Sequence, residues 1–293
     1  MKPIGIITSG GDAPGMNAAI HGVCMQAAKY SIPCIGFMDG YKGLIDNQYI
    51  SLRPSLTKQH VNQGGTFLGT TRSERFKEEQ VQEQVARRIK EQIQALIVIG
   101  GDGSFKGMEA LMKRGIPAIG IPATIDNDIE GTAITLGYQT AVRNVVEAID
   151  ILIQSANSHR HIYAVEVMGR GEGYIARYAG QAVMADGIIA TKADFNLDTV
   201  LKQIDAAVAQ GHRSQLFVIA EGAMTAHEFK ELVEAHSSYR IHDFVLGHLQ
   251  RGGNPVAQDR ISGINAGKEA IEVCIHSAFF DKRFVTIPPL SFK

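Results

Sequence analysis

Short apolar runs alternate with stretches of helical periodicity in the first half of the chain. Four apolar runs that end in glycine or polar residues predict strands at residues 4–8, 34–38, 95–99 and 118–121. Between them, apolar residues at helical spacing predict helices at residues 16–30 and 78–94, and another that ends near residue 114. This order is typical of βαβ units and predicts a parallel sheet.

A long amphipathic stretch over residues 138–155 precedes a second pattern of the same kind. This pattern predicts strands at residues 162–167, 187–190 and 216–220, and residues 244–249 form a further apolar run. It predicts helices at residues 173–184, 198–210, 225–236 and 259–277. We therefore predict an α/β fold of two Rossmann-like lobes with mainly parallel sheets. One lobe comprises residues 1–138 with about 251–293, and the other comprises residues 139–250.

The composition narrows the class of function. The 293 residues are 45% hydrophobic and include 31 glycines, which suits a globular α/β enzyme. The 29 Lys and Arg balance 30 Asp and Glu, so the charge indicates neither nucleic acid nor a membrane surface as partner. The three cysteines form no CxxC pair and indicate buried thiols. No signal peptide or apolar run of spanning length is visible, so we expect a cytoplasmic protein.

Two glycine-rich loops each follow a predicted strand and precede a predicted helix. The first is SGGDAPGMN from Ser9 to Asn17, and the second is GGDGS from Gly100 to Ser104. Glycines let backbone N–H groups approach phosphate oxygens, and helix N-termini favour anions. Asp102 adds a carboxylate of the kind that holds Mg2+. Neither loop has the Gly-Lys-Ser/Thr of a Walker A motif, and a tight turn without a ligand is the alternative interpretation.

Two further segments carry candidate chemistry. The glycine-rich run 64–72 ends in Arg72, a candidate phosphate clamp. At the end of another predicted strand, Asp126 and Asp128 follow Thr124. Phosphoryl transfer to an alcohol needs a carboxylate that accepts the hydroxyl proton. Taken alone, a surface arginine and an Asx-rich turn explain the same residues.

Polar residues also follow the predicted strands of the second lobe. Met168-Gly169-Arg170 follows one strand and Glu221 follows another, while GHLQRGG occupies residues 247–253. Each is unremarkable alone, but strand ends of one α/β lobe meet at one edge, where such folds bind ligands.

These segments together resemble the bacterial ATP-dependent 6-phosphofructokinase family. The shared motifs, in that family's order, are SGGDAPGMNAAI, GGTFLGTTR, VIGGDGS, PATIDND, VEVMGR and LGHLQRGG, spanning Lys2 to about Cys274. The resemblance implies a glycolytic kinase that moves the γ-phosphoryl of ATP, with Mg2+, onto the 1-hydroxyl of fructose 6-phosphate. It also implies an ATP-binding first lobe, a sugar-phosphate-binding second lobe, and a homotetramer with the sugar phosphate bound across a subunit interface.

The resemblance implies a role for each matching residue. Asp126 would accept the 1-hydroxyl proton, with Thr124, Arg72 and Arg170 completing the catalytic set, and Asp102 would hold Mg2+. The ATP phosphates would lie against Gly10, Arg72, Ser73, Gly101, Asp102, Gly103 and Ser104. The sugar phosphate would contact Thr124, Asp126, Asp128, His161, Met168, Gly169, Arg170, Glu221, His242, His248 and Arg251.

Several family arginines are replaced in this chain. The family has arginines that hold the 6-phosphate of a neighbouring subunit's sugar at the positions of His161 and His242, and Arg160 and Arg240 are nearby substitutes. Each lost charged hydrogen bond costs about 1.5–3 kcal/mol, so we expect weak fructose 6-phosphate affinity or a different phospho-sugar. Cationic effector-site positions of the family fall on His21, Met25, Pro54, Ile153, Gln210 and His212, so we expect no phosphoenolpyruvate inhibition.

Three alternatives remain beside the active homotetrameric kinase. A catalytically weak or non-catalytic paralogue could bind nucleotide or pair with an active subunit. The lost interface arginines also leave a dimer open. A pyrophosphate-dependent kinase is disfavoured, because pyrophosphate-using relatives carry aspartate and lysine at the positions of Gly103 and Ala123.

Overall fold

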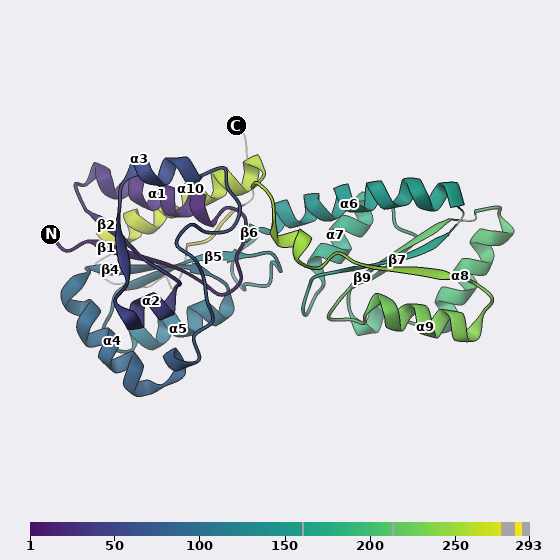
Figure 1. The fold of residues 1–293 in the computed structure, drawn as a ribbon, viewed down its shortest axis with the longest axis horizontal. Coiled ribbons are helices and arrows are strands. Elements are labelled where there is room, and N and C mark those ends of the chain that lie inside the picture. Colours follow the sequence, from purple (N-terminus) through teal and green to yellow (C-terminus); the bar gives the residue numbers. More distant parts are fainter. Residues whose placement is uncertain (160, 213, 277–284, 289–293) are drawn as a thin grey trace. The chain divides into compact units, whose positions relative to one another are not determined.

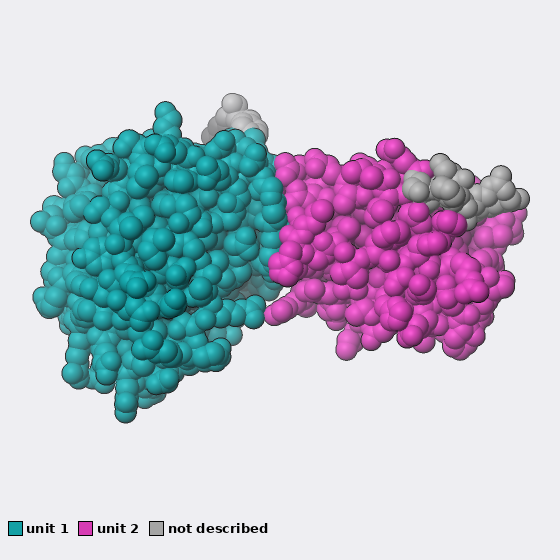
Figure 2. Space-filling model, in the orientation of Figure 1, with its two compact units in different colours: residues 1–139, 251–293 teal, residues 140–250 magenta. Residues whose placement is uncertain are grey.

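The computed structural model describes residues 1–159, 161–212, 214–276 and 285–288. The chain divides into two compact units, coloured separately in Figure 2. Unit 1 comprises Met1–Gln139 with Arg251–Lys293, and unit 2 comprises Thr140–Gln250. Among the described helices, none is both long and apolar enough to cross a membrane.

Unit 1 is built on a six-stranded sheet of order β3-β2-β1-β4-β5-β6. The pairs are parallel except for β2 with β3, which is antiparallel. Every residue of β1 and β4 is buried, as expected where helices cover both faces of a sheet. The strands are β1 Ile4–Ser9, β2 Cys34–Phe37, β3 Tyr49–Leu52, β4 Ala95–Gly100, β5 Ala118–Thr124 and β6 Leu136–Gly137.

Helices cover the two faces of the unit 1 sheet (Figure 1). On one face lie α1 Met16–Lys29, α3 Pro54–Thr57 and α10 Ala257–His276. On the other face lie α2 Tyr41–Asp46, α4 Glu79–Gln92 and α5 Asp102–Met112. The core on the second face is formed by side chains such as Phe37, Ile89 and Met108, which have no exposed surface.

Small residues let α1 and α10 pack with their backbones nearly in contact. A Cβ on Gly22 would lie 2.2 Å from the carbonyl oxygen of Ile264, and one on Gly267 would lie 2.3 Å from that of Ala19. Both are far below a van der Waals contact, so these positions require glycine. The close packing joins α10 to α1, the helix that follows the first glycine loop.

Unit 2 has a four-stranded, wholly parallel sheet of order β10-β7-β9-β8. Its strands are β7 Ile162–Val167, β8 Gly187–Ile189, β9 Gln215–Ala220 and β10 Ile241–Val245. In Figure 1, α6 Tyr138–His159 and α7 Tyr174–Ala182 lie on one face, and α8 Leu197–Ala209 and α9 Ala226–His236 lie on the other. Short 3-10 helices complete the chain: η1 Lys58–His60, η2 Arg75–Lys77, η3 Lys192–Asp194 and η4 Gly247–Arg251.

The predicted α/β fold with mainly parallel sheets is confirmed. The predicted strand at 118–121 is too short, because β5 continues to Thr124 and pairs there with β6. The apolar run at 244–249 is only partly a strand, since β10 is Ile241–Val245 and η4 begins at Gly247. The end predicted for the last helix, Ser277, lies outside the described residues, and α10 is described to His276. The elements α2, β3 and α3 were not predicted. The helices α2 and α3 span only six and four residues, and β3 has three exposed residues among four, so none carries a clear periodic pattern.

Candidate active site

Three adjacent strands of unit 1 end side by side beneath the predicted site. Ser9 at the end of β1 pairs with Gly100 at the end of β4, and Gly100 pairs with Pro122 of β5. The chain order reverses between β1 and β4, because β1 leads outward to β2 whereas β4 leads to β5. Parallel α/β sheets bind ligands at such a reversal, outside the carboxyl ends of the strands. Both glycine loops and the segment of Asp126 therefore start from one edge.

A serine braces the two glycine loops against each other. The Ser104 hydroxyl donates a 2.9 Å hydrogen bond to the Ser9 carbonyl. A Cβ on Gly100 would lie 2.5 Å from Ser104 Oγ, so glycine is needed for this approach. Gly10 has a φ of +87°, a conformation that favours glycine. The first and second loops therefore form one rigid structure.

Tyr41 fixes the first turn of α5 from below. Its buried hydroxyl donates a 2.6 Å hydrogen bond to the Ser104 carbonyl, and its ring stacks on Phe76 with centroids 4.2 Å apart. Burial raises the pKa of Tyr41 well above its ordinary value, so the phenol stays a neutral donor. Tyr41 thereby holds the N-terminus of α5 through a carbonyl group and occupies none of the N–H groups of that helix.

The space above the N-terminus of α5 is open. Among the described residues, apart from its chain neighbours and the nearby backbone of α5, no atom lies within 4 Å of a Cβ built on Gly103. The first N–H groups of a helix have no intrahelical partner, and they carry the positive end of the helix dipole. An anion such as a phosphate fits this position.

Asp102 has the donor chemistry that Mg2+ requires. Its side chain is 66% exposed at the start of α5, and it forms an ion pair with Lys106 at 2.7 Å. Among the described residues, no three His, Cys, Asp or Glu side chains form a ready-made metal cage. Mg2+ is commonly held by one or two carboxylates together with substrate phosphates, so a single exposed carboxylate at a phosphate loop fits this ion.

The loop at residues 64–72 is tied to the same edge by side-chain hydrogen bonds. Thr8 Oγ1 donates to the Gly69 carbonyl at 2.8 Å, and Thr70 Oγ1 donates to the Gly10 carbonyl at 2.8 Å. The buried Asn17 of α1 accepts from the Phe67 N–H at 3.0 Å. The exposed Arg72 and the half-buried Ser73 therefore follow a fixed segment beside the first glycine loop.

The segment after β5 forms a polar turn. Thr124 Oγ1 accepts from the Asp126 N–H at 3.2 Å, and the Thr124 carbonyl accepts from Thr135 Oγ1 at 2.6 Å. Asn127, at a φ of +54°, accepts from the Thr135 N–H at 2.8 Å. The turn leaves Asp126 half-buried and Asp128 exposed.

The N-terminus of α5 and the end of β5 are neighbours. A Cβ on Gly101 would be 3.6 Å from the Cβ of Thr124. The structure thus brings Gly101 and Asp102 next to the segment of Thr124 and Asp126, as their strand order requires.

Arg251 lies on the first glycine loop of unit 1. Its Nη1 donates to the Asp12 carbonyl at 3.2 Å. A Cβ on Gly11 would lie 2.6 Å from Nη1, so the guanidinium occupies the space that the glycine leaves. Arg251, predicted to contact the sugar phosphate, is therefore positioned by the predicted nucleotide loop.

The remaining predicted sugar residues fall into two sets within unit 2. The first set gathers at the carboxyl edge of its sheet, where the Glu221 N–H donates to the Val167 carbonyl at 2.8 Å. There the Met168 N–H donates to Gln250 Oε1 at 3.0 Å, which ties η4 to the end of β7. This edge therefore brings together Met168, Gly169, Arg170, Glu221 and His248.

The second set lies at the amino edge of the same sheet. His161 precedes β7, and His242 follows the first residue of β10. The two imidazole rings stack with centroids 4.1 Å apart and an angle of 27° between their planes. The six residues of β7 span roughly 20 Å at about 3.3 Å each, so one sugar phosphate cannot touch both edges.

Of the two arginines that the sequence places near this histidine pair, the structure describes only Arg240. Arg240 lies 3.5 Å from Glu234 in an ion pair. Arg160, the other predicted substitute, lies outside the described residues.

Of the predicted effector positions, His21 is buried and its Nδ1 is 2.9 Å from Thr57 Oγ1. Desolvation and the nearby Lys58 and Lys268 lower the pKa of His21, so it is a poor anion ligand.

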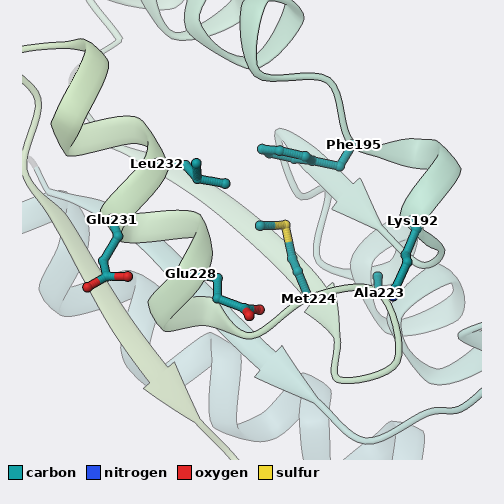
Figure 3. Close-up of a pocket in the computed structure, with 7 residues that line it drawn as sticks. All are labelled: Lys192, Phe195, Ala223, Met224, Glu228, Glu231 and Leu232. Carbon is teal, nitrogen blue, oxygen red and sulfur yellow. The ribbon is translucent and has the colours of Figure 1, made fainter.

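Unit 2 also contains a groove that the sequence did not predict. Its volume is about 500 Å³, and none of its lining residues is a predicted site residue. Figure 3 shows the apolar side chains of Phe195, Met224 and Leu232 pointing toward one another, with Lys192 and Glu228 nearby. The apolar lining lacks the clustered donors of a phosphate site.

Sequence reasoning missed three residues that shape the unit 1 site. Tyr41 and Asn17 act through contacts with residues 63 and 50 positions away, which no local pattern reveals. Lys106, by contrast, lies four residues after Asp102, and this spacing is a recognisable helical pair.

Comparison with known proteins identifies relatives over nearly the whole chain. A family model described as Phosphofructokinase matches residues 3–274. The ATP-dependent 6-phosphofructokinase of Lysinibacillus sphaericus is 40% identical over 95% of this chain and 88% of its own length. That of Listeria welshimeri is 41% identical over 94% of this chain and 87% of its own length.

Solved structures agree with the sequence relatives. The phosphofructokinase of Saccharomyces cerevisiae has a TM-score of 0.87 at 29% identity, and the match covers 95% of this chain but only 42% of that one. A pyrophosphate-dependent phosphofructokinase from Marinobacter aquaeolei has a TM-score of 0.82 at 23% identity, which supports the fold alone. With a matching family model and relatives at 40% identity over most of its length, the chain belongs to the phosphofructokinase family.

Proposed function

We propose that this chain transfers the γ-phosphoryl of ATP to the 1-hydroxyl of fructose 6-phosphate. The observation that carries the proposal is the register of β1, β4 and β5. In this register Ser9 pairs with Gly100, and Gly100 pairs with Pro122. Both glycine loops and the Asp126 segment therefore follow neighbouring strand ends. Phosphate seats and a proton acceptor on one sheet edge are the parts that phosphoryl transfer to an alcohol needs.

In the proposed reaction, Asp126 is the group that accepts the proton of the sugar 1-hydroxyl. Its carboxylate accepts the proton of the sugar 1-hydroxyl while that oxygen forms a bond to the γ-phosphorus, and the bond from γ-phosphorus to the ADP oxygen breaks. Thr124 holds the Asp126 backbone through its hydroxyl, which supports a fixed geometry for the carboxylate. Arg72 and Arg170 supply positive charge for the transferred group. Mg2+, held by Asp102, would neutralise phosphate charge when bound.

ATP is the proposed donor because of the free space at Gly103. Packing against other described parts of the chain does not require a glycine here, since none of their atoms lies within 4 Å of a built Cβ. The absent side chain instead leaves room for a ligand, as a bulky nucleotide requires. The buried Ala123, 1% exposed, likewise offers no lysine to bind pyrophosphate.

The carboxyl edge of unit 2 is the proposed sugar-phosphate seat. Gly169 has a φ of +148° and is buried, and the Gly222 N–H donates to its carbonyl at 3.1 Å. These contacts fix Met168 and Glu221 side by side. The exposed Arg170 and His248 add donors suited to a sugar phosphate.

A homotetramer in the cytoplasm is the proposed form of the enzyme. The opposite placement of His161 and His242 supports shared sites, because residues at the amino edge cannot reach a ligand at the carboxyl edge of their own sheet. They could serve the sugar phosphate of a neighbouring copy.

Release of ADP tests this proposal. The purified chain is incubated with ATP, Mg2+ and millimolar fructose 6-phosphate, and ADP is followed by a coupled assay. Turnover that depends on the sugar phosphate supports the kinase. Turnover with another phospho-sugar alone would correct the substrate.

A second candidate function is that of a weak or non-catalytic partner subunit. The stacked histidines favour it, because two imidazoles stand where the resemblance implies two arginine ligands of the sugar phosphate. Co-expression with an active relative, followed by size-exclusion chromatography and activity assay, distinguishes the two. Mixed assemblies, with no turnover by the chain alone, would support the partner role.

A further inference from the structure

The carboxylate proposed to hold Mg2+ is already paired with a cation of its own helix. Lys106 lies one turn after Asp102 on α5, and its Nζ is 2.7 Å from Asp102 Oδ2. Residues four apart share a helix face, and an acid preceding a lysine is the favourable order. The Lys106 ammonium therefore lies at the start of α5, beside the second glycine loop.

This ion pair is too exposed to act as a structural clamp. The side chains of Lys106 and Asp102 are 74% and 66% exposed, and such pairs contribute little to stability. A lysine ammonium is a compact charge on a flexible stem, so it changes partners readily. The neighbouring space at Gly103 is open, so an anion at the N-terminus of α5 can compete for the ammonium.

Mg2+ and Lys106 both require the same carboxylate. Two cations at one oxygen repel each other, so metal binding at Asp102 displaces the ammonium toward other negative charge. Glu109, three residues further along α5, is one negative charge near Lys106, and the phosphates at the N-terminus of α5 add a larger one in the proposed complex. The chain also lacks a Walker lysine, which elsewhere supplies this contact.

We propose that Lys106 is a nucleotide-phosphate ligand that neutralises Asp102 in the free chain and donates to a phosphate oxygen in the nucleotide complex. The inference rests on the proposed function, because it takes ATP and Mg2+ as the ligands of α5. It adds a residue that none of the sequence motifs assigned to the site.

Titration calorimetry with ATP, in EDTA and in excess Mg2+, tests the proposal. The variants are Lys106→Met, which removes the charge, and Lys106→Arg, which keeps it. Lys113→Met is the matched control, since Lys113 is an exposed lysine at the opposite end of the same helix. Melting temperatures of all variants are measured alongside.

Lys106→Met is expected to raise the Kd of ATP about 10-fold or more, both in EDTA and with Mg2+. Lys106→Arg keeps the charge and should stay within about threefold of the wild type, as should the control. Melting temperatures should not change, because the pair is exposed. An unchanged Kd in Lys106→Met would overturn the inference and leave the proposed function intact. A wild-type chain that binds no ATP would overturn the proposed function and this inference with it.

Discussion

The hydroxyl of Ser104 donates a 2.9 Å hydrogen bond to the carbonyl of Ser9, 95 residues earlier in sequence. The bond joins the end of the second glycine loop to the start of the first. Both residues are nearly fully buried. The bond makes the two glycine loops a single support for the proposed nucleotide phosphates.

Ser104→Ala is expected to lower both stability and nucleotide affinity. It leaves the buried Ser9 carbonyl without this donor, at a cost of about 1–3 kcal/mol in the free energy of unfolding. Urea unfolding and ATP titration measure the two effects. The exposed Ser51 of β3 provides a control, since Ser51→Ala removes a hydroxyl outside the core. Equal stability of the two variants would show that the Ser104 bond does not brace the loops.

Gly103→Asp should fold normally but lose ATP-dependent activity. No protein atom obstructs the new side chain, and an acidic residue in the first turn of a helix suits the helix dipole. Its charge would repel the nucleotide phosphates, and we expect activity to fall about 100-fold or more. Gly103→Asn separates size from charge and should retain more activity. An Asp variant as active as the wild type would place the phosphates elsewhere.

Replacing both His161 and His242 with arginine should tighten binding of fructose 6-phosphate. Two permanent charges would replace two imidazoles at positions where the family holds the 6-phosphate, so KM should fall about 10-fold or more. The value of kcat should hold, because these residues carry no proton in the proposed reaction. Steady-state kinetics of the two single variants and the double variant test this expectation. An unchanged KM in the double variant would argue against a substrate role for the pair.

The cysteine thiols should react slowly in the folded chain. Burial raises the pKa of Cys274 to about 12, while a hydrogen bond with Cys34, together with burial, raises that of Cys24. A raised pKa means fewer thiolates at a given pH. At about pH 8, Cys274 would have roughly 1000-fold less thiolate than a free cysteine, and its reactivity should increase with pH up to that pKa. Reaction with Ellman's reagent before and after denaturation measures this. Cys24 and Cys34 are buried, as predicted, whereas Cys274 is only half-buried. Rapid labelling of the native chain would contradict this expectation.

The sequence predicted those elements of the fold whose apolar pattern is long or uninterrupted. The strand at 162–167 has the bounds that the structure gives to β7. All of its residues except Glu166 are apolar or aromatic, a polar segment precedes it, and Gly169 follows it after one residue. By contrast, β3 has three exposed residues among four, so its pairing with β2 depends on the sheet edge rather than on a local pattern.

The candidate site was predictable in its parts but not in their contacts. Glycine loops and carboxylates at strand ends can be recognised from residue type alone. For this reason Asp102 and Asp126 could be predicted as site residues from the sequence. The hydrogen bond from Arg251 to the Asp12 carbonyl joins residues 239 positions apart in sequence. Local residue spacing cannot predict a contact over that separation. The stacking of His161 on His242 likewise follows from the pairing of β7 with β10.

The most direct test of the central claim is the effect of Asp126→Asn on turnover, with product analysis by phosphorus NMR. If Asp126 accepts the hydroxyl proton, kcat should fall about 100- to 10,000-fold while the Kd of ATP stays unchanged. The wild-type product should carry its new phosphate on the 1-oxygen of the sugar. A variant that keeps the wild-type kcat, or a product phosphorylated at another oxygen, would contradict the account.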